Sequence, residues 1–245
     1  MITEDTNMVS LIDGDIVAYY SAAIADGEGP DELVTAIKRT ISKWTSAAFC
    51  SKAVVFMSEG KNFRHGVYKP YKQNRKGKQK PPGVEWAKEW MLDRYDQALS
   101  DPSLEADDRM GLYATEKRDD TEEVRVIVST DKDMLTVPAW VFNPNKSLFP
   151  TLTTPLEATL NRYGQWVCGD SVDGFPGIKG FGPAKWAKYL VDNPLPTFLD
   201  ICDLFDEHEY DREFALSQYL CATIKHNGLP EGHNTLSVSD LDGVC

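Results

Sequence analysis

Four short apolar runs constrain the fold of this chain more than any other feature of its sequence. They cover residues 9–12, 53–57, 124–128 and 139–142. Their length and their polar boundaries predict buried β-strands, and the stretches between them have helical spacing. Strands that alternate with helices favour an α/β fold with a mainly parallel central sheet flanked by helices.

The second part of the chain has a different pattern. Helices are predicted to begin near Pro30 and Val84 in the first part. After about Pro150 the predicted strands stop, and short helical segments separated by glycine and proline follow. We therefore expect an α/β core over residues 1–165 and a helical region over residues 166–245, the two being separate domains or one continuous domain.

The composition excludes several classes of protein. The five cysteines are widely spaced and contain no Cys-x-x-Cys pair, so a reducing, cytoplasmic setting fits better than a zinc or redox site. Asp13 and Asp15 interrupt the first apolar run, so neither a signal peptide nor a membrane span is predicted, and we expect no membrane partner. No Walker loop, serine-hydrolase elbow or histidine-rich zinc motif is present, so no nucleotide cofactor is expected.

The charge of the chain is unevenly distributed. The net charge of −12 argues against a nucleic-acid partner, yet residues 61–80 carry many lysines and arginines and no acid. A metal-dependent nuclease needs both signs of charge, because acids hold cations and bases hold phosphate. From charge alone, a phosphate-binding stretch and a solvated charged loop remain alternatives.

Acidic residues gather where predicted strands end or predicted helices begin. The carboxyl ends of parallel strands share one edge of a sheet, and functional groups collect there. Clustered carboxylates repel one another unless cations lie between them, and hard oxygen ligands favour Mg²⁺ or Mn²⁺. Each acid taken alone has the alternative role of a helix cap or first-turn acid, but four such clusters are hard to explain by caps. The clusters contain Asp13 and Asp15; Glu105, Asp107 and Asp108; Asp131 and Asp133; and Asp170 and Asp173.

Residues 177–185, GIKGFGPAK, have the spacing of a helix-hairpin-helix. Its small residues let backbone amides approach a phosphate closely. A dinucleotide-binding turn has similar glycines, but it must follow a buried strand, and residues 168–176 are polar and glycine-rich. Such a hairpin contacts nucleic-acid backbone without reading sequence. The expected contacts are Lys179, Gly180, Gly182 and Lys185.

Taken in order, these motifs resemble the flap endonuclease and 5′-to-3′ exonuclease family of phages and bacteria. The resemblance implies a two-metal site, a helical arch or loop over about residues 61–95, and a hairpin that grips duplex DNA. It rests on LIDGD at 11–15, FRHGVYKPYKQNR at 63–75, EADD at 105–108, STDKD at 129–133 and GDSVDGFPGIKGFGPAK at 169–185.

The resemblance also assigns roles to individual residues. Lys72 and Arg75 match arch bases that contact the scissile phosphate, and Arg64 of the same basic stretch is expected to contact nucleic acid. The hairpin glycines, Gly177 among them, imply a K⁺ ion on backbone carbonyls. Among the acids, Asp13, Asp108 and Asp131 are expected to be catalytic. The implied ligands of two Mg²⁺ or Mn²⁺ ions are Asp13, Glu105, Asp107, Asp108, Asp131, Asp133, Asp170 and Asp173.

One position departs from the family pattern. Relatives commonly have an aspartate at the end of the second strand, where this chain has Met57. Glu59 or Asp15 is expected to compensate. For Asp15 two interpretations stay open: extended backbone would point it the same way as Asp13, or it caps a helix before Ile16.

The expected function is two-metal hydrolysis of phosphodiester bonds in DNA with a 5′ end, flap or nick, together with the RNA of RNA–DNA hybrids. The alternatives are a structure-specific DNA-binding module with impaired catalysis, motivated by Met57, and an RNA-directed nuclease. A phage replication role in the cytoplasm of a host cell is implied by the resemblance alone.

Overall fold

The computed structural model describes residues 7–95, 101–118 and 123–241. It divides the chain into two compact units, which we call the sheet unit and the helical unit. The sheet unit comprises residues 1–60, 79–154 and 224–228, and the helical unit comprises residues 61–78, 155–223 and 229–245.

A five-stranded sheet in the order β2-β1-β3-β4-β5 forms the centre of the sheet unit. Strands β1 to β4 are parallel, as predicted, and β5 pairs antiparallel with β4 at the edge. Strand β5 has only two residues, too few for a periodic pattern to predict it. The strands are β1 (Asn7–Asp13), β2 (Lys52–Phe56), β3 (Glu123–Val128), β4 (Trp140–Phe142) and β5 (Thr151–Leu152).

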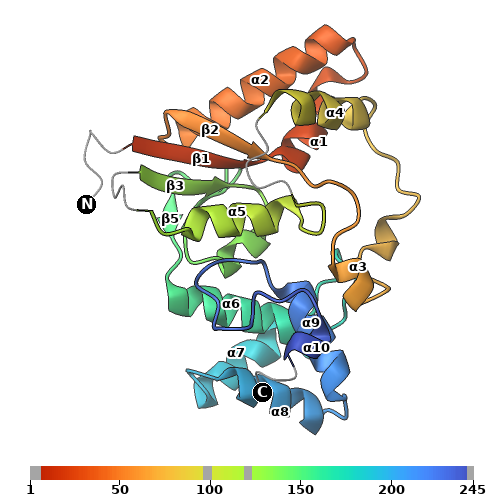
Figure 1. Ribbon diagram of the computed structural model, residues 1–245, viewed down its shortest axis with the longest axis vertical. Helices are drawn as coiled ribbons and strands as arrows, with labels where there is room; N and C mark the ends of the chain where they lie inside the picture. Colours follow the sequence, from red (N-terminus) through yellow and green to blue (C-terminus); the bar gives the residue numbers. More distant parts are fainter. Residues whose placement is uncertain (1–6, 96–100, 119–122, 242–245) are drawn as a thin grey trace. The chain divides into compact units, whose positions relative to one another are not determined.

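Helices cover both faces of this sheet. Helices α1, α2 and α4 lie on one face and α5 lies on the other (Figure 1). The predicted starts of α2 at Pro30 and of α4 at Val84 are confirmed. Proline suits the first helical position because its missing N–H has no partner there. The elements are α1 (Gly14–Ala25), α2 (Pro30–Ala47), α4 (Val84–Arg94), α5 (Ala106–Thr115) and the 3₁₀ turn η2 (Lys132–Thr136).

Strand β1 contributes to a separate apolar core on each face. Met8 and Ile12 pack in the cluster that contains residues of α1, α2 and α4. Val9 and Leu11 pack in the cluster that contains residues of α5. Because successive side chains of a strand point to opposite faces, Asp13 falls on the face that α5 covers.

The helical unit is built around a cluster of aromatic side chains. Trp166 is fully buried, stacks on Phe205 and donates its indole N–H to the carbonyl of Ala215 at 2.7 Å. The unit contains α3 (Arg64–Val67), the 3₁₀ turn η1 (Gln73–Arg75), α6 (Pro155–Cys168), α7 (Pro183–Asp192), α8 (Phe198–Glu207), α9 (Arg212–Ala222) and α10 (Val238–Leu241).

Among the residues that the structure describes, none of the helices combines the length and the apolar character that a membrane span requires.

The units are not divided at a single point near residue 165. Residues 224–228 lie within the second half of the sequence but belong to the sheet unit, where they pack on α5. The Asn227 amide donates to the carbonyl of Leu112 at 2.8 Å. A β-carbon on Gly111 would lie 2.3 Å from the carbonyl oxygen of Lys225, so this contact requires glycine.

Candidate functional site

Strands β1 and β3 end together and bring two predicted acids to one place. Asp13 is only 4% exposed. Its carboxylate caps α1 by accepting the N–H of Ile16 at 3.1 Å, and it accepts the hydroxyl of Ser129 at 3.1 Å. The same hydroxyl oxygen accepts the N–H of Asp131 at 3.1 Å. Ser129 therefore links the two acids, a role that the sequence reasoning missed.

The start of α5 is fixed to the end of β2. The N–H of Ala106 donates to the hydroxyl of Ser58 at 3.0 Å. Asp108 is fully buried and its two oxygens accept the N–H groups of Glu105 at 3.1 Å and Lys225 at 3.0 Å. Asp108 thus orders the first turn of the helix on which Glu105 and Asp107 lie, in addition to its predicted role as a ligand.

Some of the acids at this edge do have the alternative role of helix caps or first-turn acids that the sequence allowed. Asp131 caps η2 by accepting the N–H of Asp133 at 2.9 Å, and Asp107 lies in the first turn of α5. A cap uses one lone pair of a carboxylate oxygen and leaves others for a cation. The capping role and the ligand role are therefore compatible.

The electrostatics of Asp13 suit a cation. Burial and the nearby charges of Asp15 and Asp131 together raise the pKa of Asp13 to about 7, although the hydrogen bonds from Ile16 and Ser129 lower it. A divalent ion between these oxygens would reverse the effect by favouring the ionised form. In the part of the chain that the structure describes, no three acidic, histidine or cysteine side chains converge closely enough to hold a metal ion, so the full ligand set stays a prediction.

This pKa predicts how stability depends on pH. Without divalent ions, the free energy of unfolding should fall as the pH rises from about 4 to about 7, because in this window folded Asp13 keeps a proton that the unfolded chain releases. Mg²⁺ should restore stability most at the upper end of the window. Denaturant titrations across this range, with and without Mg²⁺, check the prediction. The Asp13→Asn variant lacks this carboxylate, so its free energy of unfolding should change less with pH than that of the wild type. An identical pH dependence of the two proteins would contradict the prediction.

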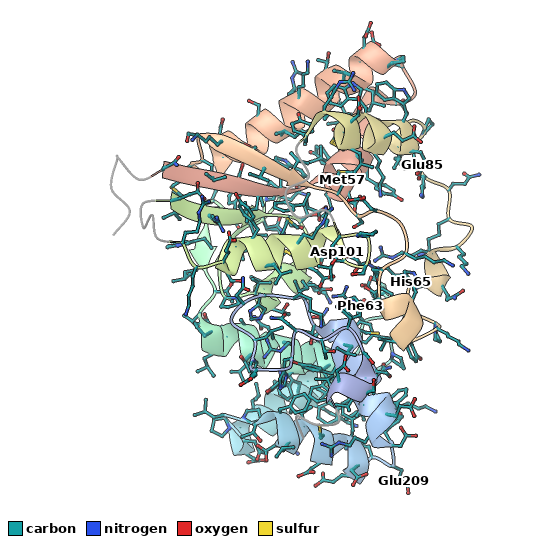
Figure 2. The ribbon with its side chains drawn as sticks, viewed as in Figure 1. Met57, Phe63, His65, Glu85, Asp101 and Glu209 are labelled. Atoms are coloured by element: carbon teal, nitrogen blue, oxygen red, sulfur yellow. The ribbon has the colours of Figure 1, made fainter. Side chains whose placement is uncertain are left out.

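Met57 lies beyond β2 inside the core and is not part of the acidic edge (Figure 2). It is fully buried, and a β-carbon on Gly14 would lie 2.2 Å from its sulfur. The two acids expected to compensate are held by bases. Asp15 lies 2.8 Å from the ammonium of Lys88, and Glu59 lies 3.3 Å from the guanidinium of Arg109.

Both sequence-based interpretations of Asp15 need correction. Strand β1 ends at Asp13 and α1 begins at Gly14, so Asp15 lies in a helix and not on extended backbone. Asp13, not Asp15, caps this helix. Instead, Asp15 accepts the N–H of Ser58 at 3.2 Å.

In the helical unit, the predicted arch bases meet a predicted metal ligand. The carboxylate of Asp173 pairs with Arg75, lies 3.6 Å from the ammonium of Lys72 and accepts the hydroxyl of Tyr71 at 2.9 Å. Asp170 accepts the N–H groups of Val172 at 2.6 Å and Asp173 at 3.2 Å. The structure therefore groups Lys72, Arg75, Asp170 and Asp173 within one unit.

Part of the basic stretch is internal. Arg64 is buried and donates to the carbonyl of Thr223 at 2.7 Å, so it supports the end of α9 and is not exposed for the predicted contact with nucleic acid. Tyr71 is also buried, and Tyr68 lies edge-on to Phe214. Both tyrosines therefore pack within the helical unit.

The predicted hairpin is the connection between α6 and α7. Its apolar residues Ile178 and Phe181 are buried, whereas Lys179, Gly180 and Lys185 are exposed. A β-carbon on Gly180 or on Gly182 would meet nothing within 4 Å, so both backbones are open to a ligand. The helix-hairpin-helix assignment and its K⁺ ion stay predictions.

A family comparison now connects this arrangement with known proteins. Residues 2–146 match the family described as the 5′-3′ exonuclease, N-terminal resolvase-like domain. The chain belongs to this family. The matched residues include the acids Asp13, Glu105, Asp107, Asp108, Asp131 and Asp133 of the sheet unit.

Individual relatives agree with this assignment. The chain is 31% identical to the exonuclease of Escherichia phage T7 over 151 residues, which cover 59% of this chain and 48% of that protein. It is 27% identical to a 5′-3′ exonuclease of Buchnera aphidicola over 223 residues, covering 82% and 74% of the two chains. The chain thus spans about half the length of the phage relative.

Solved structures share the fold. The D15 protein of phage T5, co-crystallised with metal ions, superimposes with a TM-score of 0.63 at 15% identity and covers 88% of this chain and 89% of its own. A complex of this flap endonuclease with DNA and metal ions gives a TM-score of 0.61 at 14% identity, with 88% of both chains covered. The predicted α/β fold class is therefore confirmed.

Proposed function

We propose that this chain is a divalent-metal-dependent 5′ nuclease that hydrolyses phosphodiester bonds in DNA. The observation that carries the proposal is the buried carboxylate of Asp13, joined through Ser129 to Asp131 at the carboxyl edge of the sheet. Burying carboxylates side by side is unfavourable without a cation. The names of the relatives, an exonuclease of phage T7 and a flap endonuclease bound to DNA and metal ions, supply the reaction class.

In the sheet unit, some residues would bind the metal ions, and others would keep these ligands in position. Hard oxygen donors would come from Asp13, Glu105, Asp107, Asp108, Asp131 and Asp133. These donors would hold Mg²⁺ or Mn²⁺, which would supply a metal-bound water as the nucleophile and electrostatic stabilisation of charge on the phosphate.

The ordering role belongs to residues that fix the donors in place. Ser129 fixes the distance between two strand-end acids, and Asp108 orders the first turn of α5. A donor already held in one orientation loses little conformational freedom when it binds the ion, so these contacts favour a preformed site.

The helical unit would supply further charge. We retain Asp170 and Asp173 as proposed ligands of a second ion, and Lys179, Gly180, Gly182 and Lys185 as proposed contacts with duplex backbone. Lys72 and Arg75 would contact the phosphate near the scissile bond. Their contacts with Asp173 place them beside a proposed ligand.

A second candidate, a DNA-binding module with impaired catalysis, is favoured by one observation. Met57 fills the core at the position where relatives have an aspartate, and the nearby Asp15 and Glu59 are already paired with bases. A cleavage assay separates the two functions, because a module would bind DNA without cutting it.

The test uses 5′-labelled duplex, nicked and flap DNA, and an RNA–DNA hybrid, each with Mg²⁺, Mn²⁺ or EDTA. We expect cleavage that begins at the 5′ end or flap junction, requires the metal and is lost when the 5′ end is blocked. Binding without cleavage under every metal condition would establish the DNA-binding module. Cleavage in EDTA would overturn the metal mechanism, and cleavage of the RNA strand alone would establish an RNA-directed nuclease.

A further inference from the structure

The basic side chains of Arg109 and Lys88 each contact an acid near the carboxyl edge of the sheet unit, and they differ in accessibility. The guanidinium of Arg109 is 1% exposed and contacts Glu59, so incoming ligands do not reach it. The side chain of Lys88 is 23% exposed while its ammonium lies 2.8 Å from Asp15. Lys88 is therefore more accessible to a ligand than Arg109 is.

A series of contacts fixes Lys88 to the acidic edge. Asp15 binds the ammonium through one oxygen and accepts the N–H of Ser58 through the other, at 3.2 Å. The hydroxyl of Ser58 in turn accepts the N–H of Ala106 at the start of α5, the helix of the predicted ligands Glu105 and Asp107. The ammonium of Lys88 is thus linked to the start of α5 through Asp15 and Ser58.

An ammonium group has three N–H donors, and the ion pair with Asp15 Oδ1 at 2.8 Å leaves donors for another acceptor. The ring of Tyr19 lies 6.0 Å from the ammonium, a contact that uses no hydrogen-bond donor. The remaining donors and the partial exposure fit an anion that has many acceptor oxygens. A phosphate has this chemistry, and lysine binds phosphate as a flexible point charge.

We propose that Lys88 contacts a backbone phosphate of DNA bound at the acidic edge of the sheet unit, with Asp15 as the residue that positions its ammonium. The proposal rests on the proposed function, which supplies DNA as the ligand. It adds a phosphate contact in the sheet unit to Lys72 and Arg75, whose charges lie beside Asp173 in the helical unit.

The alternative is that Lys88 only neutralises Asp15. The two roles predict different effects when Lys88 is replaced by a neutral side chain. Loss of a phosphate contact weakens DNA binding and lowers its salt dependence, because fewer counterions are released. Loss of a neutralising charge alone changes metal affinity and thermal stability and leaves the salt dependence of DNA binding unchanged.

The experiment compares Lys88→Gln with Arg94→Gln in the full chain. Arg94 is a matched control, because it lies on the same helix and also pairs with an aspartate at 2.8 Å, Asp93. Affinity for 5′-phosphorylated duplex is measured across a salt series with Ca²⁺, which is used to prevent cleavage, and single-turnover cleavage is measured with Mg²⁺. Mn²⁺ affinity and melting temperature are recorded for each variant.

We expect Lys88→Gln to lower the slope of log affinity against log salt by about one unit and single-turnover cleavage by about 10- to 100-fold. Arg94→Gln should change neither, and Lys88→Arg should restore most of the binding. Equal behaviour of the two glutamine variants, or a change confined to Mn²⁺ affinity and melting temperature, would overturn the proposal. Wild-type protein that binds DNA without cutting it would overturn the nuclease function, and the salt slopes would still decide the role of Lys88.

Discussion

Asp13→Asn is expected to lower single-turnover DNA cleavage at saturating Mg²⁺ by at least about 100-fold, the usual cost of losing one preorganised electrostatic group. The substitution removes a charge that is buried next to Asp131 and keeps an oxygen that can accept the N–H of Ile16. Folding should therefore tolerate it. In EDTA at neutral pH the variant should be at least as stable as the wild type, because burial of the Asp13 charge opposes folding there.

Asp31→Asn is the control for this prediction. Asp13 caps α1 and Asp31 lies in the first turn of α2, but Asp31 is exposed and belongs to no acidic cluster at the sheet edge. Its loss should leave cleavage within about twofold of the wild type, as for an ordinary surface substitution. Near-normal turnover by Asp13→Asn would remove Asp13 from the proposed site, and a large loss for both variants would point to a nonspecific effect of charge.

Gly177→Ala is expected to destabilise the helical unit by about 3 kcal/mol, the sum of left-handed backbone strain and overpacking. Gly177 has a φ of 58°, and a β-carbon there would lie 2.5 Å from the carbonyl oxygen of Val167 and from the backbone nitrogen of Gly169. Backbone atoms at the end of α6 cannot yield as a flexible side chain would. The N–H of Gly177 also donates to Gln218 at 3.2 Å, so a shift would break a buried hydrogen bond.

Gly180→Ala separates the two contributions. Gly180 has a φ of 74° but faces open space, so its cost should be the strain alone, about 1 kcal/mol. Denaturant unfolding measures the total loss of stability in each variant. Hydrogen exchange over residues 155–223 shows whether this loss of stability lies in the helical unit. Equal costs for the two alanine variants would mean that close packing at Gly177 contributes nothing to stability.

The sequence by itself determined the class of fold and the place of the acids. Apolar runs and helical spacing depend on neighbouring residues, so they predicted strands β1 to β4 and the starts of α2 and α4. Because parallel strands end at one edge, acids that follow β1 and β3 had to approach each other, and Ser129 joins Asp13 with Asp131 there. The types and order of the motifs along the chain also indicated the family, because both are properties of the sequence.

The partners of the charged side chains were decided by the tertiary structure. Tyr71 meets Asp173 across 102 positions of sequence, and the N–H of Lys225 meets Asp108 across 117. A spacing pattern extends over a few residues and contains no information about such contacts. The expectation that Arg64 contacts nucleic acid came from its place in the basic stretch, whereas its side chain is buried and donates to the carbonyl of Thr223 at the end of α9.

The division of the chain also depended on tertiary packing. The family resemblance implied an arch or loop of the α/β core over about residues 61–95, whereas residues 61–78 belong to the helical unit and only residues 79–95 to the sheet unit. Residues 224–228 return to the sheet unit because Gly111 leaves space for the carbonyl of Lys225 and Leu112 accepts a hydrogen bond from Asn227. Sequence patterns determined which elements form and which chemistry they carry, because both depend on local residues. Tertiary structure decided which charges meet and which chain segments pack together, because both depend on contacts between residues far apart in the sequence.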